Sequence, residues 1–335
     1  MESPPVTKPY FSSHRGREIF WLILCWVVVF VCIALLYFYW DQTRSMDLIH
    51  YLQQFRALKP VEYFFQFFTF LGSDEFYMIF FGILIWCVNK SLGFWGAAVL
   101  LVSGLVSGVV KDLAALERPV LEGMKQLESY AFPSGHTLTA VTVWGYLAIR
   151  LKKGWFWIWA LVAMLLIPFS RIILGYHYPG DILGGYAIGI PLLLFLVWLS
   201  SLFVERGWDQ KIPKAFILAL CLAIPVILTV LSPAGDMPKL MGLFAGASVG
   251  YLIEKEKVRS IPRTNWLFQL LKAILGLAVF FGIIMGLGQV LSSNHFALQA
   301  ALRFFRYALG GIWVTLLAPA LFVALKLTPC ETRGD

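Results

Sequence analysis

The sequence predicts an all-α protein, a polytopic bundle of transmembrane helices. Of its 335 residues, 59% are hydrophobic and only 14% are charged, and the mean hydropathy is +0.77. A soluble domain has about 25% charged and 45–50% apolar residues, so this chain has too few polar side chains to cover a globule in water. Since one helical crossing takes roughly 20 apolar residues, the chain has room for about ten crossings joined by short loops.

The first apolar run, residues 19–40, follows a polar head that contains Lys8, Arg15 and Arg17. The run is too long for a secretory signal, and no small-residue cleavage site follows it. We therefore expect a cytoplasmic tail over residues 1–18 and a retained first transmembrane helix. The next segment, 41–73, mixes charges with phenylalanines, which is typical of an amphipathic segment in the membrane interface. A buried half-helix is the equally weighted alternative.

Nine further apolar runs follow, and with the first they give ten predicted crossings. A polar break at 204–212 divides them into a six-helix region, 19–205, and an additional region of four crossings, 206–335, to which the sequence assigns no role. The nine runs are 74–88, 92–113, 135–150, 155–176, 181–203, 213–231, 237–253, 265–291 and 305–326.

The charges predict the orientation of the chain. Its 27 Lys and Arg exceed its 19 Asp and Glu, but they form no basic block with interleaved aromatics, so nucleic acid is not an expected partner. Most of the Lys and Arg lie on the side of the N-terminus. Because these residues resist translocation, both termini are predicted to be cytoplasmic. The expected location is the inner (plasma) membrane of a bacterium.

Two other features concern partners and bound groups. The five cysteines have no spacing for a disulfide framework or a zinc site. Glycines recur four residues apart, which lets helix backbones approach closely in a membrane. Packing within the chain is the favoured reading of this spacing, and a homodimer interface is the alternative. The glycines are Gly104, Gly108, Gly185, Gly189, Gly242, Gly246 and Gly250.

Ionisable residues at a membrane edge are costly, so they are functional candidates by default. The first group is Lys111 with Arg118-Pro119, at the outer end of the run 92–113. Lys111 and Arg118 are seven residues apart, or two helical turns, so both project from one face if the helix persists. Pro119 then ends that helix.

Two more groups follow along the chain. Pro133-Ser134-Gly135-His136 opens the run 135–150, and a helix that begins there leaves free backbone N–H groups that can bind an anion. Ser170-Arg171, His177 and Asp181 span the outer end of the run 155–176 and the start of the run 181–203. With the predicted orientation, all three groups face the extracytoplasmic side.

Together these residues can hold and cleave a phosphate ester. Arginine neutralises a phosphate with a two-pronged set of donors, and lysine supplies a point charge. A histidine can act as the nucleophile; Asp181, four residues after His177, could fix the tautomer of that ring. His136 would then protonate the leaving alkoxide and later activate water.

The three groups resemble the tripartite signature of the type 2 phosphatidic acid phosphatase (PAP2) superfamily, which includes vanadium haloperoxidases. That signature is Lys-x6-Arg-Pro, Pro-Ser-Gly-His and Ser-Arg-x5-His-x3-Asp, and no position departs from it. The resemblance covers residues 15–205. It implies His177 as a nucleophile that forms a phosphohistidine, Asp181 as its orienter, His136 as general acid and base, and no metal or other cofactor. The implied phosphate cradle is Lys111, Arg118, Ser134, Gly135 and Arg171.

The expected function is therefore metal-independent hydrolysis of a membrane lipid phosphate or diphosphate on the extracytoplasmic side. Candidate substrates are phosphatidate, a polyprenyl diphosphate and a sphingoid or lysolipid phosphate. Two enzymatic alternatives stay open: transfer of the phosphoryl group to another lipid, and hydrolysis of a soluble phosphate as in glucose-6-phosphatase. A non-enzymatic lipid transporter or scramblase is the alternative from another class.

Overall fold

The computed structural model describes residues 15–121, 129–291 and 293–331. The chain forms two compact units. The first contains residues up to Gly72 and residues 109–212, and the second contains residues 73–108 and those from Pro213 onward. Part of the tail expected at 1–18 and the segment 122–128 lie outside the described residues. By their contacts, residues 73–108 belong to the second unit. These contact-based units do not test the boundary expected near residue 205, which stays a prediction.

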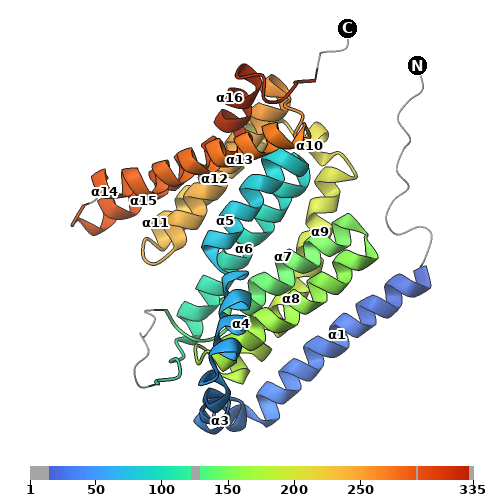
Figure 1. The fold of residues 1–335 in the computed structure, drawn as a ribbon, viewed down its shortest axis with the longest axis vertical. Helices are drawn as coiled ribbons and strands as arrows, with labels where there is room; N and C mark the ends of the chain where they lie inside the picture. Colours follow the sequence, from blue (N-terminus) through green and yellow to red (C-terminus); the bar gives the residue numbers. More distant parts are fainter. Residues whose placement is uncertain (1–14, 122–128, 292, 332–335) are drawn as a thin grey trace. The chain divides into compact units, whose positions relative to one another are not determined.

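Four long helices form the frame of the first unit. They are α1 (Arg15–Phe38), α7 (Gly135–Leu151), α8 (Gly154–Ile173) and α9 (Pro179–Val204). Helix α7 packs against both α8 and α9, and α1 packs against α9; Figure 1 shows α7 and α8 side by side in green. Much of the α1 surface is exposed apolar side chain, as expected for a helix that faces lipid.

Close approach of α9 to the start of α7 depends on a glycine. A Cβ atom at Gly185 would lie 2.6 Å from the Cβ of Thr137 and 3.2 Å from the carbonyl oxygen of Ser134. A side chain there would therefore push the two helices apart. The glycine spacing thus serves packing within the chain at this position, and a homodimer stays untested.

The segment predicted as amphipathic, 41–73, folds into short helices: α2 (Trp40–Thr43), α3 (Met46–Arg56) and α4 (Lys59–Phe70). Ser45 caps α3 by accepting a hydrogen bond from the backbone N–H of Asp47. Helices α3 and α4 pack against α8, while Tyr63, Phe64 and Phe67 remain exposed. The inner side of this segment thus faces α8, and its outer side is aromatic.

The second unit is also helical. Its elements are α5 (Asp74–Ile83), η1 (Leu84–Val88), most of α6 (Lys90–Ala114), α11 (Lys214–Leu231), α12 (Met237–Ile253), η2 (Glu254–Val258), α13 (Trp266–Phe281), η3 (Gly282–Gly286), α14 (Leu287–Val290), α15 (Phe296–Ile312), η4 (Trp313–Leu317) and α16 (Ala318–Ala324). Helix α10 (Trp208–Lys211) comes just before α11 in the chain and belongs to the first unit. Helices α12 and α15 pack closely against each other. The absence of a side chain at Gly246 permits this approach, since a Cβ atom there would lie only 1.9 Å from the Ala308 carbonyl oxygen.

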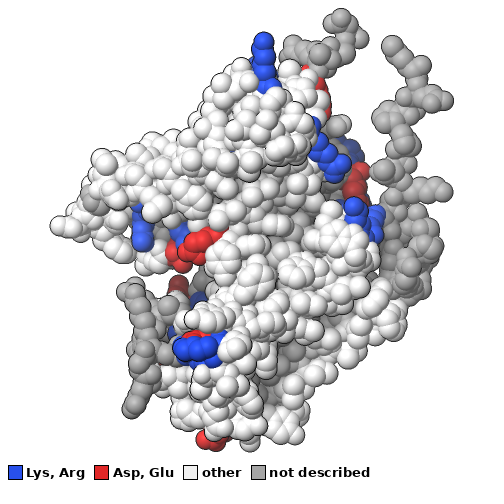
Figure 2. Space-filling view, in the orientation of Figure 1, with Lys and Arg blue, Asp and Glu red and all other residues white. Residues whose placement is uncertain are grey.

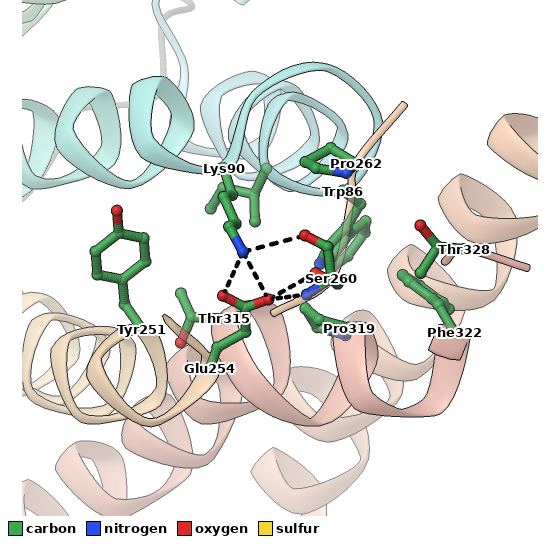
Figure 3. A pocket seen from close by; sticks show the side chains of 11 residues that line it. Trp86, Lys90, Tyr251, Glu254, Ser260, Pro262, Thr315, Pro319, Phe322 and Thr328 are labelled. Atoms are coloured by element: carbon green, nitrogen blue, oxygen red, sulfur yellow. Dashed lines mark hydrogen bonds and ion pairs between the residues drawn. The ribbon is translucent and has the colours of Figure 1, made fainter. Parts of the chain in front are cut away.

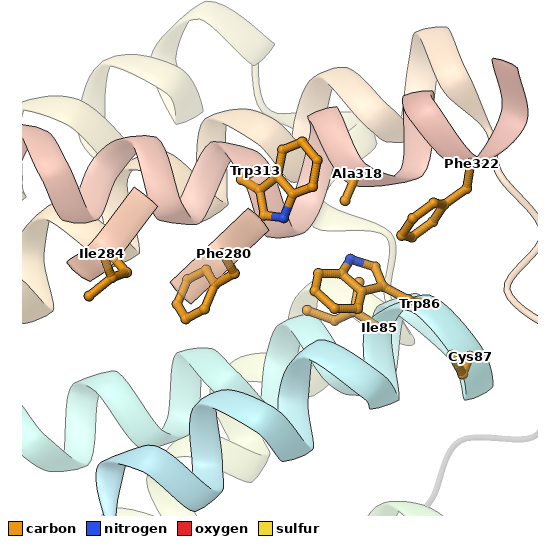
Figure 4. Close-up of a cluster of buried hydrophobic side chains, with 8 residues drawn as sticks. All are labelled: Ile85, Trp86, Cys87, Phe280, Ile284, Trp313, Ala318 and Phe322. Carbon is orange, nitrogen blue, oxygen red and sulfur yellow. The ribbon is translucent and has the colours of Figure 1, made fainter. Parts of the chain in front are cut away.

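An apolar cluster joins η1 to the C-terminal helices within this second unit (Figure 4). Trp86 and Trp313 lie in it, and each indole N–H is satisfied: Trp86 donates to the carbonyl of Val314 at 2.7 Å, and Trp313 donates to that of Gly276 at 2.9 Å. Buried indoles normally need such a partner. The other members are Ile85, Cys87, Phe280, Ile284, Ala318 and Phe322.

A buried charged group lies in the same unit (Figure 3). The Lys90 ammonium is 3.0 Å from Oε2 of Glu254, and Ser260 donates to Oε1 of Glu254 through its backbone N–H at 2.9 Å and its hydroxyl at 2.6 Å. Glu254 is almost fully buried, so these donors compensate its charge. Lys272, which is also buried, donates to the carbonyls of Trp86 and Pro262.

The described residues contain seven helices that are long and apolar enough to cross a membrane, or eight if the bent pair α4 and α5–η1 forms one span. This confirms a multi-pass membrane protein, and Figure 2 shows a face on which charges are confined to a few small groups. The other two predicted crossings are α7 and α12, with 17 residues each. Such helices are about 26 Å long, slightly short of a 30 Å hydrocarbon core. The count of ten crossings therefore stays a prediction.

One predicted boundary is wrong. The last crossing was expected to begin at residue 305, whereas its helix begins at Phe296. The cause is Arg303 and Arg306, which interrupt the apolar run without interrupting the helix. Arg303 donates to the carbonyl of Gly235, and the Arg306 guanidinium lies over the Tyr307 ring.

Candidate active site

The start of α7, the end of α8 and the start of α9 lie at the same end of the first unit, since these helices follow one another in alternating directions. Ser134 is the N-cap of α7, and its hydroxyl accepts a hydrogen bond from the backbone N–H of Thr137. The backbone N–H of Ser134 donates to the carbonyl of Asp181 at 2.9 Å. This bond joins the Pro-Ser-Gly-His segment directly to the segment that carries His177.

His177 and Asp181 form a buried pair. Nδ1 of His177 lies 3.2 Å from Oδ2 of Asp181, and the backbone N–H of Tyr178 donates to the same oxygen at 2.9 Å. The two side chains are 2% and 0% exposed. A carboxylate in this position favours the tautomer with the proton on Nδ1, which leaves the lone pair of Nε2 for attack.

Arg118 faces that second ring nitrogen. Its Nη1 is 3.1 Å from Nε2 of His177 and donates to the carbonyl of Tyr176 at 2.9 Å. Its Nε and Nη2 donate to the backbone carbonyl and hydroxyl of Ser129. A guanidinium is thus fixed beside the atom that would attack phosphorus.

Lys111 and Arg171 bring two more cations to the site. Lys111, in the last turn of α6, donates to the carbonyls of Tyr130 at 2.5 Å and Ala131 at 3.3 Å. Arg171, in the last turn of α8, is 6% exposed and donates from Nη1 to the hydroxyl of Thr69 at 2.6 Å. Its Nε has no hydrogen-bond partner among the described residues, so this buried donor is available to a phosphate oxygen.

His136, the second residue of α7, belongs to the same charge cluster. The positive charges of Arg171, Arg118 and Lys111 act on its ring. The ring lies against Gly72, where a Cβ atom would come within 2.9 Å of its Cδ2. All eight residues predicted from the sequence therefore gather at this end of the first unit, while their roles stay predictions.

The electrostatics favour a neutral imidazole on His177. Burial lowers the pKa of His177 well below 6.5, and the positive charges of Arg171, Arg118 and Lys111 lower it further. A neutral imidazole keeps its Nε2 lone pair at neutral pH. The cations that would neutralise a bound phosphate thus also keep the His177 ring unprotonated.

Two residues that contact the site were not predicted from the sequence. Arg44 forms an ion pair with Oδ1 of Asp181 at 2.5 Å, and Thr69 accepts from Arg171 as described. Both come from the segment 41–73, for which the sequence predicted either an interfacial amphipathic segment or a buried half-helix. A usable signal was present, since this segment joins the first two predicted crossings on the face assigned to the three motifs.

Two family models match separate parts of this chain. Residues 92–205 match the family model described as the PAP2 superfamily, and residues 238–331 match "PAP2 superfamily phosphatase, transmembrane extension". Phosphatidylglycerophosphatase B of Bacillus subtilis is 32% identical over 163 residues, covering 44% of this chain and 74% of that protein.

More distant relatives were also found. A probable sphingosine-1-phosphate phosphatase of Dictyostelium discoideum is 25% identical over 64% of this chain and 57% of its own length. An undecaprenyl-diphosphatase of Sulfolobus acidocaldarius is 33% identical over 25% of this chain and 37% of its own length. The crystal structure of the first transmembrane PAP2 type phosphatidylglycerolphosphate phosphatase from Bacillus subtilis aligns with a TM-score of 0.43 and 21% identity, covering 57% of this chain and 97% of that one.

The fold and the matches define an integral, multi-pass membrane phosphatase. The chain belongs to the PAP2 superfamily. It is a phosphoric monoester hydrolase of the lipid phosphate phosphatase class, and its C-terminal region, unassigned from the sequence alone, matches a known extension of this family.

Proposed function

We propose that this enzyme hydrolyses the phosphate monoester or diphosphate of a membrane lipid through a phosphohistidine on His177, without a metal ion, on the extracytoplasmic side. The observation that carries the proposal is the arrangement around one ring: Asp181 lies 3.2 Å from its Nδ1, and Arg118 lies 3.1 Å from its Nε2. One nitrogen is oriented, and the other faces a phosphate-binding cation.

In the first step, Nε2 of His177 attacks phosphorus and the bond from phosphorus to the lipid oxygen breaks. Lys111, Arg118 and Arg171 stabilise the charge of the transferring group, together with the N–H groups at the start of α7 beside Ser134 and Gly135. His136 gives its proton to the leaving lipid oxygen. The products of this step are the lipid alcohol and phosphohistidine.

In the second step, His136 takes a proton from water, and the resulting hydroxide attacks phosphorus. The bond from phosphorus to Nε2 breaks, inorganic phosphate leaves, and both histidines return to their starting states. Splitting one displacement into two lowers the barrier of each.

A lipid substrate is favoured by the relatives and by the helices around the site. The similar proteins are named for phosphatidylglycerophosphate, sphingosine-1-phosphate and undecaprenyl diphosphate, which share a phosphate on a lipid. The exposed apolar faces of α1 and α8 suit a tail that stays in the bilayer. The excess of Lys and Arg on the N-terminal side supports an extracytoplasmic site.

The test compares purified wild type with His177→Ala on a panel of lipid phosphates in the presence of EDTA. We expect phosphate release from wild type and none from the variant. A rapid quench with labelled substrate should trap label on the wild-type protein that is stable in alkali and lost in acid. His50→Ala, which removes an exposed histidine of α3, is the matched control and should keep full activity. Phosphate release by His177→Ala, or a strict need for a divalent ion, would refute the proposal.

A further inference from the structure

Arg44, in the turn between α2 and α3, contacts two of the three motif segments. Its Nη1 forms the 2.5 Å ion pair with Oδ1 of Asp181, and its Nη2 donates to the carbonyl of Glu117 at 2.8 Å. Glu117 directly precedes Arg118. A single guanidinium therefore joins the carboxylate that orients His177 to the peptide that carries a phosphate-binding arginine.

The two oxygens of Asp181 have different partners. Oδ2 accepts from His177 and from the backbone of Tyr178, and Oδ1 pairs with Arg44. The Asp181 side chain is 0% exposed, so its charge has no water to stabilise it and depends on these donors. Arg44 is the one side chain that pairs with Oδ1 among the described hydrogen bonds and ion pairs.

Two aromatic rings hold the Arg44 guanidinium. Its central carbon lies 4.6 Å from the centroid of the Tyr178 ring and 5.5 Å from that of Trp40. These cation–π contacts hold the guanidinium in place. Its N–H groups remain free to donate to Asp181 and to the carbonyl of Glu117. Its side chain is only 13% exposed, which also limits its freedom to move away.

We propose that Arg44 is a positioning residue for phosphoryl transfer: it fixes the Asp181 carboxylate against His177 and keeps Arg118 in register with the same ring. This inference rests on the proposed function of His177. Arg44 does not touch the reacting atoms, so its removal should slow the chemical steps more than it weakens substrate binding.

If Arg44 only stabilised the fold, its loss would lower activity in step with thermal stability. The first unit offers a matched control for this possibility. Arg150, at the end of α7 opposite the site, has its Nη1 2.5 Å from Oε1 of Glu205 and donates from Nη2 to Ser200. Its guanidinium lies 5.4 Å from the Tyr146 ring, and its side chain is 14% exposed. Arg150→Gln therefore removes the same kinds of contact away from the site.

The experiment compares Arg44→Gln, Arg44→Lys, Arg44→Ala, Arg150→Gln and His177→Ala with wild type in detergent, on a lipid phosphate and a soluble aryl phosphate. We expect kcat of Arg44→Gln to fall roughly 10- to 100-fold, as for other residues that orient a reacting group. Its KM should stay within about threefold, the sign of an interaction needed for the chemistry rather than for binding.

Arg44→Lys should fold, since it keeps the charge, yet lose kcat, because one ammonium cannot reproduce the two-pronged contact. Added methylguanidine should restore part of the activity of Arg44→Ala.

Three results would overturn the inference. One is Arg44→Gln activity close to wild type while His177→Ala is inactive, which would leave the proposed function intact. Another is equal losses of activity in Arg44→Gln and Arg150→Gln that follow their losses in thermal stability, which would show that Arg44 acts only by stabilising the fold. The third is an active His177→Ala, which would refute the proposed function and with it the role of Arg44.

Discussion

Oδ2 of Asp181 accepts hydrogen bonds both from Nδ1 of His177 and from the backbone N–H of Tyr178, at 3.2 and 2.9 Å. Tyr178 is the N-cap of α9, and Asp181 lies in the first turn of that helix. An acidic residue there satisfies a free backbone donor and interacts favourably with the helix dipole. The carboxylate that stabilises the start of α9 is therefore also the one that orients the predicted nucleophile.

Replacement of Asp181 by asparagine should lower kcat by up to about 10⁴-fold with little change in KM, the loss known for the same change in a Ser-His-Asp triad. An amide is neutral and presents one oxygen, so it cannot serve Arg44, Tyr178 and His177 as the carboxylate does. Steady-state kinetics on a soluble aryl phosphate would measure the change, with Asp236→Asn in the second unit as control. A raised KM with unchanged kcat would contradict the orienting role.

Activity should persist well into the acidic range. Burial and the charges of Arg171, Arg118 and Lys111 hold the pKa of His177 well below 6.5, so the ring is neutral at pH 6.5 and becomes protonated only as the pH falls through that lowered pKa. The acid limb of kcat/KM should therefore lie below pH 6.5. Arg171→Gln removes the largest of the three charge effects and should move this limb to higher pH, while Arg150→Gln should not. A wild-type acid limb at or above pH 6.5 would refute the electrostatic account.

Loss of His136 should depend on the leaving group. His136→Ala removes the proton donor for the departing lipid oxygen, so hydrolysis of a lipid phosphate should fall by about 10²–10⁴. An activated aryl phosphate, whose oxygen leaves without a proton, should lose much less in the phosphorylation step. Pre-steady-state kinetics on both substrates would measure this difference. Equal losses on both would remove His136 from the role of general acid.

The buried pair of the second unit should contribute to stability rather than to catalysis. Glu254→Gln leaves the Lys90 ammonium, only 22% exposed, without its counter-charge, and should cost about 3 kcal/mol. Glu256→Gln is the matched control: it breaks an ion pair with Lys214 whose side chains are 44% and 68% exposed, and an exposed pair of this kind contributes little to stability. Thermal unfolding in detergent would compare the two. Equal melting temperatures would show that the Glu254 cluster contributes nothing.

The long helices were predictable because hydropathy alone determines them. Helix α11 (Lys214–Leu231) was expected at 213–231, and α12 (Met237–Ile253) was expected at 237–253. The start of α15 was not predictable, since a hydropathy pattern does not show that Arg303 and Arg306 find partners along the helix. The fold of 41–73 was equally hidden, because its short helices depend on packing against α8.

The eight motif residues were predictable because their types and spacing carry the chemistry. Arg44 and Thr69 were not, since neither belongs to a motif, and each acts on a residue more than 100 positions away in the chain. Only the folded chain shows that Asp181 and Arg171 need partners from the segment 41–73.

The bond from the Ser134 backbone N–H to the Asp181 carbonyl has a mechanical consequence. Ser134 stands two residues before His136, and Asp181 stands four residues after His177, so both imidazoles lie close in the chain to one backbone hydrogen bond. A displacement of either segment would strain this hydrogen bond, so the positions of the two imidazoles are coupled through the backbone.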